Sequence, residues 1–217
     1  MRAKKLTQYL IFSLENNLPV LIKGAPGIGK SDIVNQACEK LNYELIISHP
    51  VVADPTDYKG LPFVVDGKAR FLPFGDLEKL LTAEKPIVFF LDDLGQATPT
   101  VQSAVMQLLL ARQINGHKIS DYVRFVAATN RREDRANVSG ILEPVKSRFT
   151  GGIVELEINN EDWIDWAWKN GMPSELISFI QFRPKQLFNF NPTRDIENSP
   201  NPRTVAGVGK MLTCKNR

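Results

Sequence analysis

The chain has 217 residues, of which 43% are hydrophobic and 24% charged, as in an ordinary globular protein of one or two domains. Its net charge of +3 is too small to predict nucleic-acid binding by itself. Because no apolar stretch has the length of a membrane span and no signal peptide is recognisable, we expect a cytoplasmic protein without membrane contact. The two cysteines and two histidines predict neither a disulfide framework nor a metal cluster.

The first fifty residues predict helices and strands in alternation. A helix from about Leu6 to Glu15 precedes a short buried strand at Leu18–Ile22, and a second helix ends near Leu41. A strand is expected at Glu44–Ser48. The segment His49–Leu61, rich in Pro, Asp and Gly, is expected to be irregular.

The next residues predict a hairpin and then a central strand. Phe63–Val65 and Ala69–Leu72 flank Asp66-Gly67, which is a strong signal for a two-residue hairpin turn. A short helix is expected at Asp76–Thr82. The unbroken apolar run Ile87–Leu91 is typical of a strand that is buried on both faces.

The remaining core elements complete an alternating pattern. Thr98-Pro99 caps and starts a helix with one apolar stripe. Val123–Ala128 is predicted as another buried strand, and Ile153–Ile158 as the last strand. Because strands alternate with helices, we expect an α/β fold with a parallel sheet covered on both faces.

The composition changes after Ile158, and we expect a core over residues 1–158 and a small helical domain over 159–217. Helices are predicted from Asn160 to near Gly171, from Glu175 to Phe182 and from Arg203 to Leu212. The last, basic helix has little to pack against, which predicts a truncated domain.

The strongest chemical signal is the run Gly24-Ala25-Pro26-Gly27-Ile28-Gly29-Lys30-Ser31, which fits the phosphate-binding pattern G-x-x-x-x-G-K-[ST] without a mismatch. In such a loop the backbone N–H groups surround a phosphate, Lys30 reaches the β- and γ-phosphates, and the Ser31 hydroxyl can ligate Mg²⁺. The dinucleotide pattern G-x-G-x-x-G fails, because Asp32 stands where the third glycine belongs. The sequence therefore predicts a nucleoside triphosphate site.

Two adjacent acids, Asp92 and Asp93, follow the apolar run Ile87–Leu91. A nucleotide hydrolase needs one acid at the tip of a buried strand to hold Mg²⁺ and a second carboxylate to polarise the attacking water. Asp92 and Asp93 can fill these two roles in that order. The alternative is that they only end the strand and cap the following turn.

Together these segments resemble the AAA+ ATPases, and within them the MoxR-like and dynein-related branch. Gly24–Ser31 resembles the Walker A motif and Phe89–Asp93 the Walker B motif. The strand that ends at Asn130 resembles the sensor-1 strand. Ile141–Phe149 resembles the segment that ends in the arginine finger, here Arg148.

Two further segments extend the resemblance over nearly the whole chain. Asp54–Gly60 with the hairpin at Asp66-Gly67 resembles the insertion that marks this branch, and Asn201–Thr204 resembles the sensor-2 start of the lid helix. The resemblance implies a P-loop core with a five-stranded parallel sheet in the order 5-1-4-3-2, the hairpin insertion and a small helical lid. It also implies ATP and Mg²⁺ as cofactors and a ring of copies of the chain, with a hexamer as the expected size.

The resemblance assigns roles to four residues. Asp93 and Asn130 act on the attacking water, Arg148 on the γ-phosphate of a neighbouring subunit, and Arg203 on the nucleotide of its own subunit. Asn130 could instead cap the next turn, and Arg203 could be solvated. Three other arginines compete with Arg148 for the finger role: Arg131, Arg132 and Arg135.

The function that the resemblance implies is Mg²⁺-dependent ATP hydrolysis coupled to remodelling of a protein partner in a ring. One departure is that the family usually has Glu where this chain has Asp93, which is one methylene shorter. Slow hydrolysis, or a nucleotide-bound scaffold with little turnover, therefore stays an alternative. An ATP-dependent loader or switch on nucleic acid is the other, and salt-sensitive DNA binding would favour it.

Overall fold

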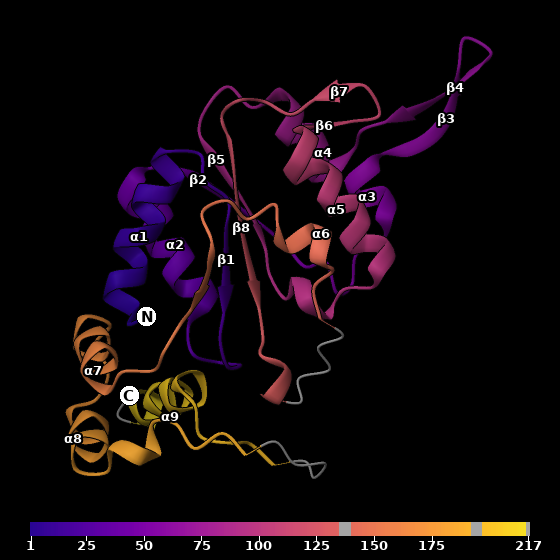
Figure 1. Cartoon of the computed structure of the whole chain (residues 1–217). Helices are drawn as coiled ribbons and strands as arrows, with labels where there is room; N and C mark the ends of the chain where they lie inside the picture. Colours follow the sequence, from indigo (N-terminus) through magenta and orange to yellow (C-terminus); the bar gives the residue numbers. More distant parts are fainter. Residues whose placement is uncertain (135–139, 192–196, 216–217) are drawn as a thin grey trace.

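A computed structural model describes residues 1–134, 140–191 and 197–215 of the chain (Figure 1). Its centre is a sheet of five strands: β1 (Val20–Lys23), β2 (Glu44–Ser48), β5 (Ile87–Leu91), β8 (Val123–Thr129) and β9 (Ile153–Glu155). The strands run parallel in the order β2-β5-β8-β1-β9. Numbered along the core and read from β9, this is 5-1-4-3-2, so the predicted order is confirmed.

Helices cover both faces of this sheet, as predicted (Figure 1). On one face lie α1 (Ala3–Glu15) and α2 (Lys30–Leu41), and on the other lie α3 (Pro55–Lys59), α4 (Gly75–Thr82), α5 (Pro99–Ala111) and α6 (Glu143–Lys146). Successive side chains of a strand point to opposite faces. In β5, Phe89 therefore joins the cluster under α3–α6, while Phe90 joins the cluster under α1 and α2. This explains why β5 is apolar throughout.

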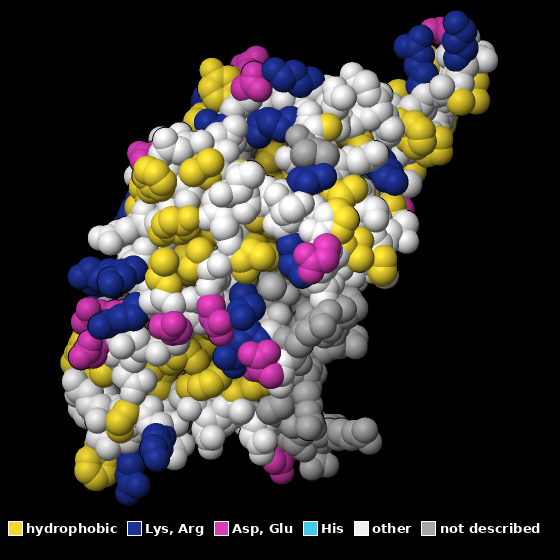
Figure 2. All heavy atoms as spheres, in the orientation of Figure 1, with side chains coloured by type: hydrophobic (Ala, Val, Ile, Leu, Met, Phe, Trp, Pro, Cys, Tyr) yellow, Lys and Arg dark blue, Asp and Glu magenta, His cyan; other side chains and the backbone are white. Residues whose placement is uncertain are grey.

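The predicted hairpin is confirmed by β3 (Leu61–Val65) and β4 (Lys68–Leu72), which pair antiparallel and project away from the body (Figure 1). Asp66 and Gly67 have φ angles of 51° and 70°. Positive φ at both central residues is what the tight hairpin turn requires. Hydrophobic side chains lie along this hairpin and basic ones near its tip (Figure 2). Among them Phe63 is 64% exposed and Val64 67% exposed.

Several short elements were not predicted, among them α6. The segment expected to be irregular contains α3, which begins with a capping box: Asp57 Oδ2 accepts from the Asp54 N–H at 2.8 Å. A second small hairpin joins β6 (Gln113–Ile114) to β7 (His117–Lys118) through Asn115-Gly116. The start of α3 and the turn between β6 and β7 each carry a recognisable local signal, namely Asp-Pro at a helix start and Asn-Gly at a hairpin turn.

The C-terminal helices form a cluster of their own. The elements α7 (Asn160–Lys169), α8 (Ser174–Phe182) and α9 (Pro202–Lys215) pack around buried residues such as Trp163 and Ile177. The expected division of the chain at residue 158 stays a prediction. The last core strand ends at Glu155, three residues earlier than predicted. None of the helices within the described ranges is long and apolar enough to cross a bilayer.

Candidate nucleotide site

The loop Gly24–Ser31 joins the end of β1 to the start of α2, at the carboxyl edge of the sheet. Gly27 and Gly29 have φ angles of 72° and 93°, which side-chain-bearing residues rarely adopt. The N–H of Gly24 donates to the Thr129 carbonyl at 3.2 Å and so ties the loop to β8. The loop thus meets α2 at its N-terminus, where the helix dipole favours an anion.

Some residues of the predicted loop bury their side chains in the core, and others line the pocket. Ala25 and Ile28 are buried in the hydrophobic cluster beneath the loop, so that only their backbone groups are available to a ligand. Pro26, Gly27 and Gly29 line a pocket above it. A Cβ at Gly24 would meet Ile28 Cδ1 at 2.7 Å and the Leu156 carbonyl oxygen at 3.2 Å, so a side chain there would force its neighbours to shift.

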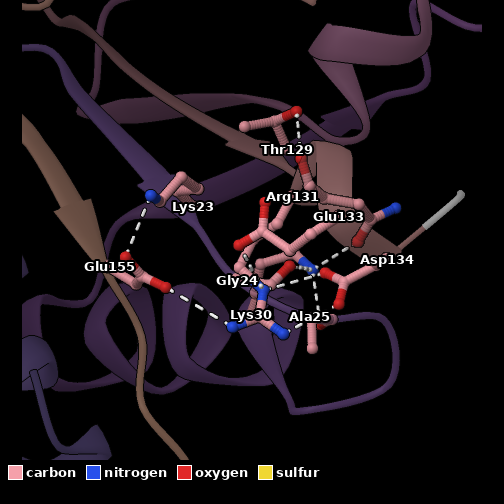
Figure 3. A network of polar contacts seen from close by, with 10 residues as sticks. Lys23, Gly24, Ala25, Lys30, Thr129, Arg131, Glu133, Asp134 and Glu155 are labelled. Carbon is pink, nitrogen blue, oxygen red and sulfur yellow. Dashed lines mark hydrogen bonds and ion pairs between the residues drawn. The ribbon is translucent and has the colours of Figure 1, made fainter. Parts of the chain in front are cut away.

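Lys30 is the buried cation of the site, with 7% of its surface exposed. Its Nζ donates to the carbonyl oxygens of Gly24 and Ala25, each at 2.9 Å, and to Asn130 Oδ1 at 2.7 Å (Figure 3 shows the two loop contacts). Burial lowers the pKa of the Lys30 ammonium to about 8, although Asp93 and Asp92 oppose that shift. An ammonium that lacks water in this way gains strongly from an incoming anion.

Ser31 and Asp92 form the candidate metal site. The Ser31 hydroxyl donates to Asp92 Oδ2 at 2.7 Å, and the Asp92 N–H donates to the Ser48 carbonyl at 2.9 Å. Within the described ranges, no three His, Cys, Asp or Glu side chains gather to hold a metal. One hydroxyl and one carboxylate are nevertheless hard oxygen ligands of the kind that Mg²⁺ uses when substrate phosphates and water complete its shell. The residues therefore fit Mg²⁺ bound with a nucleotide.

Asp93 and Asn130 lie beside this pair. Asn130 is buried, and its Nδ2 donates to Asp93 Oδ1 at 3.0 Å and to Gln96 Oε1 at 3.4 Å, while its Oδ1 accepts from Lys30. Both ends of the amide thus contact side chains of the site. Asp93 precedes a short 3₁₀ turn at Leu94–Gln96, and its carbonyl accepts from the Gln96 N–H at 3.0 Å, but its side chain makes no capping hydrogen bond. Its burial, together with the neighbouring Asp92 charge, raises the pKa of the Asp93 carboxyl.

The C-terminal segment also reaches the loop. Arg203 lines the pocket together with Lys30, Ser31, Asp92, Asp93 and Asn130, and its N–H donates to the Gly27 carbonyl at 3.0 Å. Asn201 lies so close to Gly27 that a Cβ on the glycine would meet Asn201 Oδ1 at 2.4 Å. The contacts made by Gln96 and Asn201 were not predicted. A local sequence signal marked the position of Asn201, because Asn-Pro is typical of a helix start, whereas no sequence pattern marked Gln96.

The structure does not bring Arg148 to this pocket. Arg148 follows α6, and its guanidinium donates to Ser147 Oγ at 2.8 Å. Its Nε is buried without a partner among the described residues. Of the competing arginines, Arg131 is held by Asp134 through two hydrogen bonds, at 2.9 and 2.7 Å (Figure 3). Arg135 and the side chain of Arg132 lie outside the described part.

Comparison with known proteins agrees with this geometry. The family model of the AAA domain (dynein-related subfamily) matches residues 19–149, which is more than half of the chain. The chain belongs to this AAA family. Midasin of Giardia intestinalis is 26% identical to it over 178 residues, which cover 78% of the chain and 4% of midasin. The chain therefore spans a small part of that relative's length.

Solved structures of other proteins share the AAA fold. RuvB of Thermotoga maritima superposes with a TM-score of 0.62 at 20% identity, covering 98% of this chain and 63% of RuvB. NtrX of Brucella abortus in complex with ATP superposes with a TM-score of 0.62 at 14% identity, covering 99% of this chain and 49% of NtrX. These likenesses show the fold of this AAA protein. Its placement in the MoxR-like branch stays a prediction.

Proposed function

We propose that this AAA protein binds ATP with Mg²⁺ and hydrolyses it to ADP and phosphate. One observation carries the proposal: Asn130 joins the buried Lys30 ammonium to the Asp93 carboxylate, while Ser31 and Asp92 pair beside them. A cation for the phosphates, a hard-oxygen pair for the metal and a carboxylate for water are the three components of a phosphoryl-transfer site. All three line one pocket.

Each residue has a defined task in the proposed reaction. Lys30 leaves the Gly24 and Ala25 carbonyls to bind the phosphates, and the N-terminus of α2 stabilises their charge. Asp93 accepts a hydrogen bond from the attacking water and draws off its proton, with Asn130 fixing the direction of the carboxylate. Mg²⁺, held by Ser31 and Asp92, would neutralise charge that develops on the phosphate oxygens.

We further propose that turnover is coupled to remodelling of a protein partner within a cytoplasmic ring of copies of the chain. Two features support this. Arg148 does not line the pocket of its own chain, so a neighbouring copy is the natural source of a transition-state cation. The hairpin β3–β4 exposes the large apolar side chains Phe63 and Val64, which suit a protein partner better than a polyanion. Salt-sensitive DNA binding would favour the nucleic-acid alternative instead.

Separate tasks for Asp92 and Asp93 give the first test. Asp93→Asn should keep ATP affinity but stop phosphate release, because the amide cannot take a proton from water. Asp92→Asn should weaken the Mg²⁺ dependence of ATP binding, because it removes a charged oxygen from the pair with Ser31. Asp93→Glu should preserve or raise turnover, because it restores the longer reach usual in the family. Phosphate release and calorimetric ATP binding, with and without Mg²⁺, measure these effects.

Asp66→Asn is a matched control, because Asp66 lies in an exposed turn where Asn is tolerated at positive φ. It should release phosphate at the parent rate. Hydrolysis by Asp93→Asn at the parent rate would show that Asp93 does not polarise the water. ATP retained by the parent without any phosphate release would favour the scaffold alternative.

The lowered pKa of Lys30 predicts that ATP binding takes up a proton in mildly alkaline solution. In the free protein the ammonium loses its proton near pH 8, whereas bound phosphates stabilise the charged form and raise its pKa. Above pH 8 affinity should therefore fall with rising pH, by up to about tenfold per unit, and below pH 8 it should not. Calorimetry in two buffers of different ionisation enthalpy measures the proton uptake. Equal apparent enthalpies at pH 8.5 would contradict the prediction.

A further inference from the structure

A chain of ion pairs crosses the ends of three adjacent strands next to the first residues of the phosphate loop (Figure 3). Arg131 follows β8, Lys23 ends β1, and Glu155 ends β9. Glu155 pairs with Lys23 at 2.9 Å and with Arg131 at 3.6 Å. Arg131 also pairs with Asp134 at 2.7 Å and with Glu133 at 3.6 Å. Arg131 thus has more ionic partners than Lys23 or Glu155.

The pair of Arg131 with Asp134 differs from the others in burial. Asp134 is 4% exposed and Arg131 27%, whereas Lys23 and Glu155 are each 40% exposed. Two guanidinium nitrogens, Nε and Nη2, donate to the two carboxylate oxygens of Asp134. Such a two-pronged contact fixes orientation as well as distance. The Asp134 N–H closes the same turn by donating to the Arg131 carbonyl at 3.3 Å.

This turn directly follows the residue at the centre of the site. Asn130 immediately precedes Arg131, and its buried amide bridges Lys30 and Asp93. At the other end of the chain of ion pairs, Lys23 precedes Gly24, the first loop residue. The Gly24 N–H donates a hydrogen bond to the carbonyl of Thr129, the residue before Asn130. The ion pairs are therefore next to two backbone segments: the one that sets the orientation of the Asn130 amide, and the one where the phosphate loop begins.

We propose that Arg131 is a positioning residue, which clamps the chain after β8 to Asp134 and Glu155 and so holds the Asn130 amide between Lys30 and Asp93. Arg131 does not line the pocket with Asn130, so it acts through that residue and not on the nucleotide. The effect on turnover rests on the proposed ATPase function. The effect on the Asn130 amide does not.

Two variants test the clamp. Arg131→Lys keeps the charge but loses the two-pronged contact with Asp134. The double variant Arg131→Met/Asp134→Leu removes the pair without leaving a buried unpaired carboxylate, which a single change to Ala would do. A matched control is Lys118→Met, because Lys118 pairs with Asp121 at the same three-residue separation but on the surface.

Two readouts separate positioning from simple stabilisation of the fold. In the folded double variant kcat should fall by about 10- to 100-fold with unchanged ATP affinity, because a small misplacement of an aligned group costs that much. The side-chain amide resonances of Asn130, assigned by their loss in Asn130→Asp, should move in the ligand-free protein. Arg131→Lys should show the same two effects to a smaller extent, and Lys118→Met neither of them.

Unmoved Asn130 resonances in the folded double variant would overturn the proposal, whatever the rate. Moved resonances with parent kcat would overturn it as well, because the clamp would then not serve turnover. If the parent itself releases no phosphate, the proposed ATPase function fails, while the amide resonances still decide whether Arg131 positions Asn130.

Discussion

Arg148→Ala should bind ATP as tightly as the parent protein and turn it over on the order of a thousandfold more slowly. Arg148 does not line the pocket of its own chain, so its loss should not disturb ATP binding there. In a ring, its guanidinium would reach the γ-phosphate of a neighbouring subunit and stabilise charge in the transition state. Its Nε, buried without a partner among the described residues, is a donor still to be satisfied. Phosphate release and ATP titration measure the two effects separately.

Mixing subunits tests whether Arg148 acts across an interface. Arg148→Ala and Asp93→Asn should each be inactive alone. A mixture should recover activity at interfaces where an intact Asp93 meets an intact Arg148 from the neighbour. Lys146→Ala is the control, because Lys146 is a nearby cation whose ammonium pairs with Glu143. No recovery despite demonstrated co-assembly, or turnover by a proven monomer that does not depend on concentration, would contradict a finger supplied by the neighbour.

Lys30→Ala should abolish ATP binding and leave the fold intact. Lys30 supplies the buried cation of the loop, and its loss leaves the phosphate charge uncompensated there. The fold should tolerate the change, because the pKa of Lys30 near 8 lies below its ordinary value of 10.5 and shows that burial penalises the charged form. That penalty is present below pH 8 and is relieved as pH rises through 8 toward 10.5.

Isothermal titration with ATP and a thermal unfolding curve measure the effects of Lys30→Ala. Lys40→Ala is the control, because Lys40 is an exposed residue in the last turn of the same helix. ATP affinity equal to that of the parent in folded Lys30→Ala would overturn the whole nucleotide assignment.

Much of the fold was predictable because its signals are local. The apolar run of β5 reflects two covered faces, and Asp66-Gly67 specifies a turn that few other residue pairs allow. The loop Gly24–Ser31 is equally local, because one continuous segment supplies its glycines, its lysine and its hydroxyl. The strand order came from the family resemblance and not from these patterns.

The unpredicted parts of the site depend on contacts between distant residues. Asn130 bonds to Lys30, which lies a hundred positions earlier, and no spacing rule connects them. The Arg131–Asp134 pair has helix-like spacing, but no local pattern indicates the second contact of Arg131, with Glu155 at the end of β9. The early end of β9 at Glu155 is likewise not visible in an alternating run that continues to Ile158. Local pattern therefore located the loop and the acids but not their partners.

The hydrogen bond from the Arg203 N–H to the Gly27 carbonyl makes the phosphate loop a cap for α9. The first N–H groups of a helix have no partner within the helix, so α9 depends on the loop for one of them. If ATP shifts the Gly27 carbonyl, it changes the free energy of holding α9 in place. By thermodynamic reciprocity, if ATP changes the protein's affinity for a partner that displaces α9, that partner changes the affinity for ATP by the same factor. If the proposed remodelling takes place, the start of α9 is thus a point at which ATP binding and partner binding can influence each other.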